Sequence, residues 1–127
     1  MTEVTFKAVV ATAERNDQDA YCQVGLADDP NNPKSYVLLQ RAYAFDDHDR
    51  KTGMDGHYIE INGQGCSTYK GCTRATLKGA LLELYCDPAR LKDVSKVSID
   101  LGTARVDPNF TALLAEILGD AFESSSG

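Results

Sequence analysis

Apolar residues stand at every second position in several parts of the chain, the pattern of strands with one buried face. Near the N-terminus these residues are Val4, Phe6, Ala8 and Val10. Segments 20–27 ("AYCQVGLA") and 36–45 ("YVLLQRAYAF") indicate two further strands, and the second has apolar residues on both sides. It is therefore predicted to be a central strand, in which a buried Arg41 guanidinium needs a partner.

The second half of the chain predicts two hairpins and a last strand. Residues 58–61 form a short strand, and Asn62-Gly63 is a strong turn signal, so its partner strand is expected to begin near Gln64. Lys78-Gly79 separates strands 73–77 and 80–86. The alternation of Val97, Ile99 and Leu101 predicts the last strand.

Two Asp-Pro pairs predict two helices, because aspartate caps a helix and proline suits its first position. Asp87-Pro88 is expected to start a short helix over 88–93, and Asp107-Pro108 a long one over 108–122. The long helix carries an apolar stripe that we interpret as a packing face. Its members are Phe110, Leu113, Leu114, Ile117, Leu118, Ala121 and Phe122.

These elements predict an α+β fold in which the C-terminal helix covers one face of a sheet. We expect a mostly antiparallel sheet of about six to eight strands in a single domain over residues 1–122. The proline- and asparagine-rich segment 28–35 is a predicted loop. Residues 123–127 ("ESSSG") are expected to form a flexible tail.

Charge and composition limit the kinds of molecule that the protein is expected to bind. Thirteen Lys and Arg against nineteen Asp and Glu give a net charge of −6, which disfavours nucleic acid and suits a cationic partner or solubility. The sequence shows neither a signal peptide nor an apolar run long enough for a membrane span, so we expect a cytoplasmic protein with no membrane partner. The four cysteines, Cys22, Cys66, Cys72 and Cys86, are expected to be reduced thiols.

The segment "FDDHDRKTGMDGHYIEI" (45–61) contains both histidines and four aspartates, so it is the natural place to look for chemistry. It does not fit a calcium loop: counted from Asp49, position six is Met54, where a glycine is required. Nothing in the spacing brings His48 and His57 to one metal ion. We therefore predict no catalytic residue, no metal and no cofactor.

The same segment has the composition of a shaped loop. Gly53 and Gly56 bracket a compact turn, since glycine tolerates positive φ. The preceding aspartates are predicted to cap a short helical turn, to lie in solvent, or to form part of a negative binding surface.

The chain resembles the immunity protein 10 family of bacterial polymorphic toxin systems. The likeness rests on "ADDP" (27–30), "LQRA" (39–42), the acidic spacer 46–49, "GMDGHYIEIN" (53–62), Gln64 and Gly71. It covers residues 4–122 and is sharpest over 36–80. Cys72 stands where the family pattern has a second glycine.

This resemblance implies a protein that binds a toxin domain and blocks it, with no reaction of its own. An acidic inhibitor would meet a basic toxin quickly through electrostatic steering. The expected toxin-binding residues are Asp28, Asp29, Asp46, Asp47, Asp49, Asp55 and Tyr58. Tyr36, Tyr43 and Tyr69 are further candidates for aromatic anchors, although tyrosines on strands also serve in packing.

Two other readings stay open at this point. One is a small cytosolic enzyme using His57 with Asp55 or Cys66. The other is a structural or oligomer-forming module, such as a homodimer, which an exposed apolar face on the last helix or a long unpaired strand edge would favour.

Overall fold

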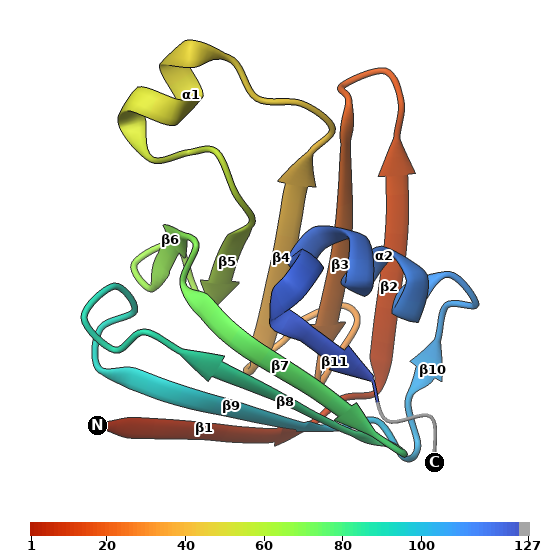
Figure 1. The fold of residues 1–127 in the computed structure, drawn as a ribbon. Coiled ribbons are helices and arrows are strands. Elements are labelled where there is room, and N and C mark those ends of the chain that lie inside the picture. The colour runs from red at the N-terminus through yellow and green to blue at the C-terminus, as the bar shows by residue number, and fades with distance from the viewer. Residues whose placement is uncertain (125–127) are drawn as a thin grey trace.

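The computed structural model describes residues 1–124, which form eleven strands and two α-helices. The strands make two sheets that meet at an angle (Figure 1). Sheet A has the order β1-β9-β8-β7-β11, and sheet B has the order β10-β2-β3-β4-β5-β6. The predicted α+β class, with a helix near the C-terminus, is confirmed.

Sheet A contains β1 (Thr2–Lys7), β7 (Cys72–Lys78), β8 (Leu81–Cys86), β9 (Val94–Asp100) and β11 (Phe122–Ser124). Sheet B contains β2 (Val10–Asn16), β3 (Tyr21–Ala27), β4 (Tyr36–Ala42), β5 (Tyr58–Ile61), β6 (Ser67–Tyr69) and β10 (Arg105–Val106). The helices are α1 (Asp47–Thr52) and α2 (Phe110–Leu118), and the 3-10 turn η1 (Gly119–Ala121) follows α2.

The prediction of one mostly antiparallel sheet of six to eight strands was wrong in the number of sheets and strands: six of the nine strand pairs are antiparallel, but both sheets are mixed. Sheet A contains two parallel pairs, β1 with β9 and β11 with β7, and sheet B contains one, β10 with β2. Parallel partners are far apart in the sequence, so no turn signal marks their pairing. The prediction of an interior strand at β4 was correct.

The N-terminal alternation belongs to two strands that lie in different sheets. The backbone N–H of Ala8 donates to Asp100 O of sheet A (3.0 Å), and the next N–H, of Val9, donates to Ala27 O of sheet B (2.8 Å). The chain therefore changes sheets at this one peptide. Ala8 is fully buried there, and its position continues the alternation without interruption.

The hairpin at Asn62-Gly63 has a longer turn than predicted, because β6 begins at Ser67. Asn62 and Gly63 have positive φ angles of 56° and 136°, and Cys66 N–H donates to Gly63 O (3.1 Å). The hairpin at Lys78-Gly79 is confirmed, with Lys78 paired to Leu81.

The Asp-Pro signals mark capped turns more reliably than helices. Asp87 Oδ1 accepts the N–H of Ala89 (3.0 Å), but Lys92 and Asp93 have positive φ, and residues 88–93 form turns without a helix. The predicted long helix is shorter: α2 runs from Phe110 to Leu118, Gly119 (φ 58°) caps it, and Phe122 begins β11. Tertiary pairing with β7 thus overrides the helical pattern after Leu118.

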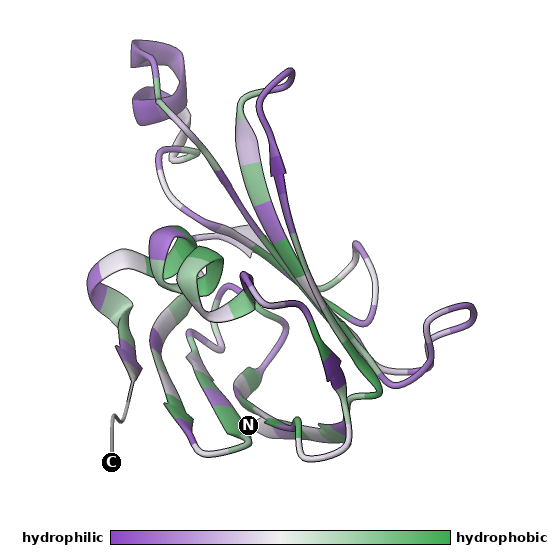
Figure 2. Ribbon diagram, turned by 90° about the vertical axis from the view of Figure 1, so that its right-hand side faces the viewer, coloured by the Kyte–Doolittle hydropathy of each residue, from purple (hydrophilic) through white to green (hydrophobic). Residues whose placement is uncertain are grey.

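The apolar stripe of α2 fills the angle between the sheets. Five of its members, Phe110, Leu113, Leu114, Ile117 and Leu118, are buried, as predicted for a packing face. The helix packs against β2, β3 and β4, and it lies on the same side of sheet B as sheet A does (Figure 2). Arg41 finds its expected partners here: Nη1 donates to Ile117 O (3.2 Å), and the guanidinium stacks over Phe45.

The expected tail at 123–127 overlaps β11, in which Glu123 pairs with Thr76 and Ser124 with Leu77. Residues 125–127 lie outside the described residues. Among residues 1–124, no helix has the length and apolar character that crossing a membrane requires.

The close packing around Gly71 can be tested by substitution. A Cβ built there would lie 2.6 Å from Thr68 Cγ2 and 2.9 Å from Leu91 Cδ1, so Gly71→Ala should lower the free energy of unfolding by about 1–3 kcal/mol. Gly65→Ala is the control, because its Cβ would meet only the flexible Lys92 Nζ at 3.4 Å. Urea unfolding curves of equal midpoint for both variants would contradict this packing.

Candidate functional site

The side chains of β3 to β6 that point away from α2 form one open surface, named here the outer face of sheet B. By strand register its members are Tyr21, Gln23, Gly25, Ala27, Tyr36, Leu38, Gln40, Ala42, Tyr58, Glu60, Ser67 and Tyr69. The alternate residues, including Val24, Leu39 and Ile59, are buried in the core. Since α2 and sheet A lie on the opposite side of sheet B, neither covers this face (Figure 2).

Glu60 stands at the middle of this face, and its side chain is nearly enclosed, with 8% of the residue exposed. Tyr36 donates a short hydroxyl hydrogen bond to Oε2, and Tyr58 donates one to Oε1 (2.7 Å). Both carboxylate oxygens therefore accept a hydrogen bond from a neutral phenol. The hydrogen bond to Glu60 raises the pKa of Tyr36 to about 12, so Tyr36 stays protonated as a donor.

Aromatic and amide side chains extend the face on both sides of Glu60. The rings of Tyr58 and Tyr69 pack edge to face, with centroids 5.5 Å apart. Burial, above other causes, raises the pKa of Tyr58. Gln40 Nε2 donates to Gln23 Oε1 across β4 and β3. The surface thus combines aromatic area with polar groups already held in place, as protein-binding surfaces commonly do.

Two hollows flank the Glu60 cluster. One, of about 240 Å³, is lined by Gln40, Tyr58 and Tyr69 together with Asp49 and Met54 of the α1 segment. The other, of about 320 Å³, is lined by residues of β2 to β4 and by Asp29, Pro30 and Pro33 of the 28–35 loop. Both acidic segments predicted from the sequence therefore border the same open face.

Asp28 and Asp29, the predicted site residues of the 28–35 loop, also accept backbone hydrogen bonds within that loop. Asp28 Oδ1 accepts the backbone N–H groups of Lys34 (2.9 Å) and Ser35 (3.2 Å). Asp29 Oδ1 accepts those of Asn31 and Asn32, and these bonds lower the pKa of Asp29. Each aspartate stabilises a turn and keeps its second carboxylate oxygen available.

The α1 segment holds the other predicted aspartates in three different roles. Asp46 and Asp49 form a capping box at the start of α1, which was one of the alternatives left open by the sequence. Asp47 has 91% of its side chain exposed and pairs with Arg50 (3.2 Å). Asp55 Oδ1 lies 2.5 Å from Lys70 Nζ, and this contact lowers the pKa of Asp55. That oxygen accepts no hydrogen bond of good geometry, so the attraction is mainly between the charges.

The two acidic segments do not meet. They lie at opposite ends of β4, whose seven residues span roughly 20 Å. Tyr58, the predicted aromatic member, lies between them on the outer face. Sequence reasoning missed Glu60, although its position two residues after Tyr58 in a strand places both on one face.

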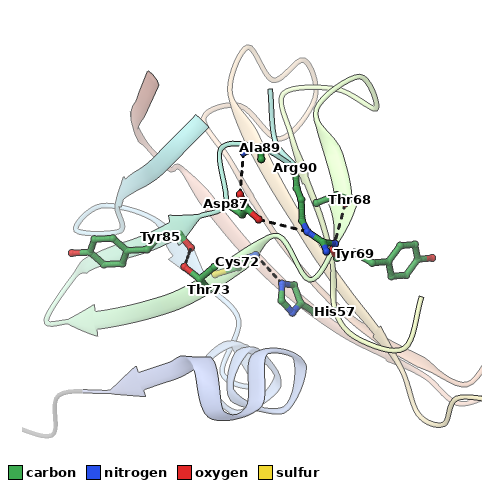
Figure 3. Close-up of polar contacts among 9 residues, drawn as sticks. All are labelled: His57, Thr68, Tyr69, Cys72, Thr73, Tyr85, Asp87, Ala89 and Arg90. Atoms are coloured by element: carbon green, nitrogen blue, oxygen red, sulfur yellow. Dashed lines mark hydrogen bonds and ion pairs between the residues drawn. The ribbon is translucent and has the colours of Figure 1, made fainter. Parts of the chain in front are cut away.

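The two histidines lie in different surroundings, and His57 and Cys66 each make a hydrogen bond to the backbone. His48 is exposed on α1, whereas His57 is buried with 7% of the residue exposed. His57 Nε2 accepts the backbone N–H of Cys72 (3.0 Å; Figure 3), and Cys66 Sγ donates to Leu91 O (3.4 Å). Among residues 1–124, no three His, Cys, Asp or Glu side chains gather in a way that would hold a metal ion.

His57 should make stability depend on pH. Burial and, second, Arg41 lower its pKa from 6.5 to about 4, so between these values the unfolded chain binds a proton that the folded chain does not. As pH falls from 6.5 to 4, the folded state should lose roughly 3 kcal/mol through this group.

The control is His57→Gln, whose amide oxygen keeps an acceptor for the Cys72 N–H and does not titrate. Urea unfolding at pH 7, 5.5 and 4 should show a smaller loss of stability for the variant. Equal losses in both proteins would contradict a neutral buried histidine.

A scan against protein-family models places most of the chain in one family. The model for immunity protein 10 matches residues 7–107, which include the outer face of sheet B and both acidic segments. A search of curated proteins found no match. On this match, the chain belongs to the immunity protein 10 family.

Proposed function

We propose that this chain binds and neutralises a cognate bacterial toxin domain in the cytoplasm of the cell that makes it. The toxin would belong to a polymorphic toxin or contact-dependent competition system. The observation that carries the proposal is the family match over residues 7–107. The net charge of −6 also supports it, because an acidic inhibitor attracts a basic toxin over long range.

The proposed contact surface is the outer face of sheet B with its two acidic borders. It includes the residues predicted from the sequence: Asp28, Asp29, Asp46, Asp47, Asp49, Asp55 and Tyr58. Support comes from Tyr58, which lies on the face, and from Asp29 and Asp49, which line the two hollows beside it. Such a surface offers buried anchors at the centre and charge at the rim.

We propose no catalytic role. In the enzyme alternative, His57 would act with Asp55 or Cys66, but His57 Nε2 is engaged by the Cys72 backbone and Asp55 is paired with Lys70. The oligomer-forming alternative named an exposed apolar face on the last helix, whereas the stripe of α2 is buried. A homodimer through an unpaired strand edge stays a prediction, which the mass of the purified protein in solution would test.

Growth protection tests the proposed function directly. A toxin domain encoded beside this chain's gene should stop growth when expressed alone in a bacterial host, and co-expression of this chain should restore growth. The two purified proteins should also form a complex of defined mass. Failure to restore growth, with both proteins present and folded, would refute the proposal.

Removal of charge at the borders should slow association with a basic toxin domain. Asp29→Asn/Asp47→Asn keeps the side-chain shapes and the acceptor oxygens, and should lower the association rate on the order of tenfold at low salt. The difference should shrink as salt screens the charges.

A matched control removes two exposed acids of sheet A, Glu3 and Glu123, as glutamines. Stopped-flow or surface-based kinetics across a salt series would compare the two proteins. An equal slowing in both would show that net charge acts without regard to position, and would remove the borders from the proposed surface.

A further inference from the structure

Glu60 is a buried negative charge that the chain itself leaves without a cation. Its two hydrogen-bond donors, the Tyr36 and Tyr58 hydroxyls, are neutral. None of the ion pairs formed among residues 1–124 includes Glu60. A carboxylate removed from water without an opposite charge is unfavourable, so its presence at this position calls for an explanation.

Sheet A provides an internal comparison. Glu83 also lies on the outward side of its sheet, with 19% of its side chain exposed, and Lys96 Nζ lies 2.6 Å from its Oε2. Lys96 and Arg74 both lie over the Tyr85 ring. Arg74 also forms an ion pair with Glu123. Glu83 and Glu123 on the outward side of sheet A thus each have a cationic partner, whereas Glu60 on the outer face of sheet B has none among the described residues.

The surroundings of Glu60 are negative and open. By strand register, no lysine or arginine of β3 to β6 lies on the outer face of sheet B. Arg41 of β4 lines the hollow beside Tyr58, but its Nη1 donates to Ile117 O on the inner side of the sheet. The bordering segments 28–35 and 46–55 contain six aspartates and three basic residues, Lys34, Arg50 and Lys51. Tyr36 and Tyr58, the two residues that donate to the carboxylate, are themselves partly exposed, so this cluster borders solvent.

We infer that Glu60 is the anchor for an arginine of the protein partner, which binds the carboxylate between Tyr36 and Tyr58 on the outer face of sheet B. An ionised carboxylate has about four acceptor positions, and the tyrosines occupy two. A guanidinium fork matches the remaining pair, and its flat face stacks on a tyrosine ring. The inference rests on the proposed function and names the chemistry of that partner.

In the complex, the Glu60 carboxylate and the partner's guanidinium would be buried together at the centre of the interface. Removal of one member of such a pair leaves the other buried and unpaired, which makes the loss of affinity large. In the free chain the same removal relieves an unpaired charge. Affinity and stability should therefore respond in opposite directions when Glu60 is neutralised, a combination that a structural glutamate would not give.

The test compares Glu60→Gln with Glu83→Gln, using the purified toxin domain encoded beside this chain's gene as the probe. Glu60→Gln should weaken the complex by about a hundredfold, measured by calorimetry, while the urea midpoint of the free protein is unchanged or higher. Glu83→Gln should leave affinity within about twofold and lower the urea midpoint, because Lys96 loses its partner.

If wild type binds the toxin domain and Glu60→Gln binds within about threefold of it, the anchor is refuted and the proposed function stands. If Glu60→Gln loses as much stability as Glu83→Gln, the carboxylate is structural and the inference is also refuted. If wild type does not bind, both proposals fall.

A second variant covers the case in which Glu60→Gln does not fold. Glu60→Asp keeps the charge but withdraws it by one methylene, and should weaken the complex by about tenfold. Combining it with alanine substitutions of the toxin's arginines should reveal one non-additive pair. Strict additivity for every arginine would overturn the assignment.

Discussion

Burial of the apolar stripe of α2 between the two sheets is the interaction on which the rest of the fold depends. Sheets A and B share no strand pairing in the described residues, so backbone hydrogen bonds alone do not fix the angle between them. Leu114 and Ile117 are fully buried, and Phe110 nearly so. At about 1.5–3 kcal/mol for each large side chain, this stripe contributes a substantial part of the energy that holds the layers together.

Because of this packing, the two faces of sheet B have different surroundings. The inner face is committed to α2, with Val24 and Leu39 fully buried. The outer face is free of that demand and carries tyrosines, glutamines and one enclosed glutamate. If Glu60 binds an arginine of the partner, as we infer, its charge would destabilise the free protein and strengthen the complex, which is the exchange expected where binding was favoured over stability.

The features predicted correctly from the sequence are those that depend on residues close together in the chain. The apolar pattern of 20–27 predicted β3, and the Lys78-Gly79 turn predicted the β7–β8 hairpin. A helical cap at the aspartates before "RKTG" was one of the alternatives that the sequence offered. The sequence could not predict the parallel pairs, because β1 meets β9 across more than eighty residues of chain. The helix predicted at 88–93 failed because a capping aspartate stabilises an isolated turn equally well.

The candidate site was predictable in part for the same reason. Composition marked the 28–35 and 46–55 segments, and the structure places both beside one face. Their convergence on that face depends on the length of β4 and on the register between β4 and β5. The sequence alone does not mark Glu60, because its hydrogen-bond donor Tyr36 lies twenty-four residues away in sequence and on the neighbouring strand.

The position of α2 after ten of the strands has a consequence for synthesis. Strands β1 to β10 leave the ribosome before Phe110, so both sheets can form hairpins while their apolar faces still lack the helix. The nascent chain therefore passes through a stage with exposed apolar surface, in which chaperone binding competes with aggregation. Completion of the fold is delayed until the helix emerges, and only then does the polypeptide acquire a rigid surface to present to another molecule.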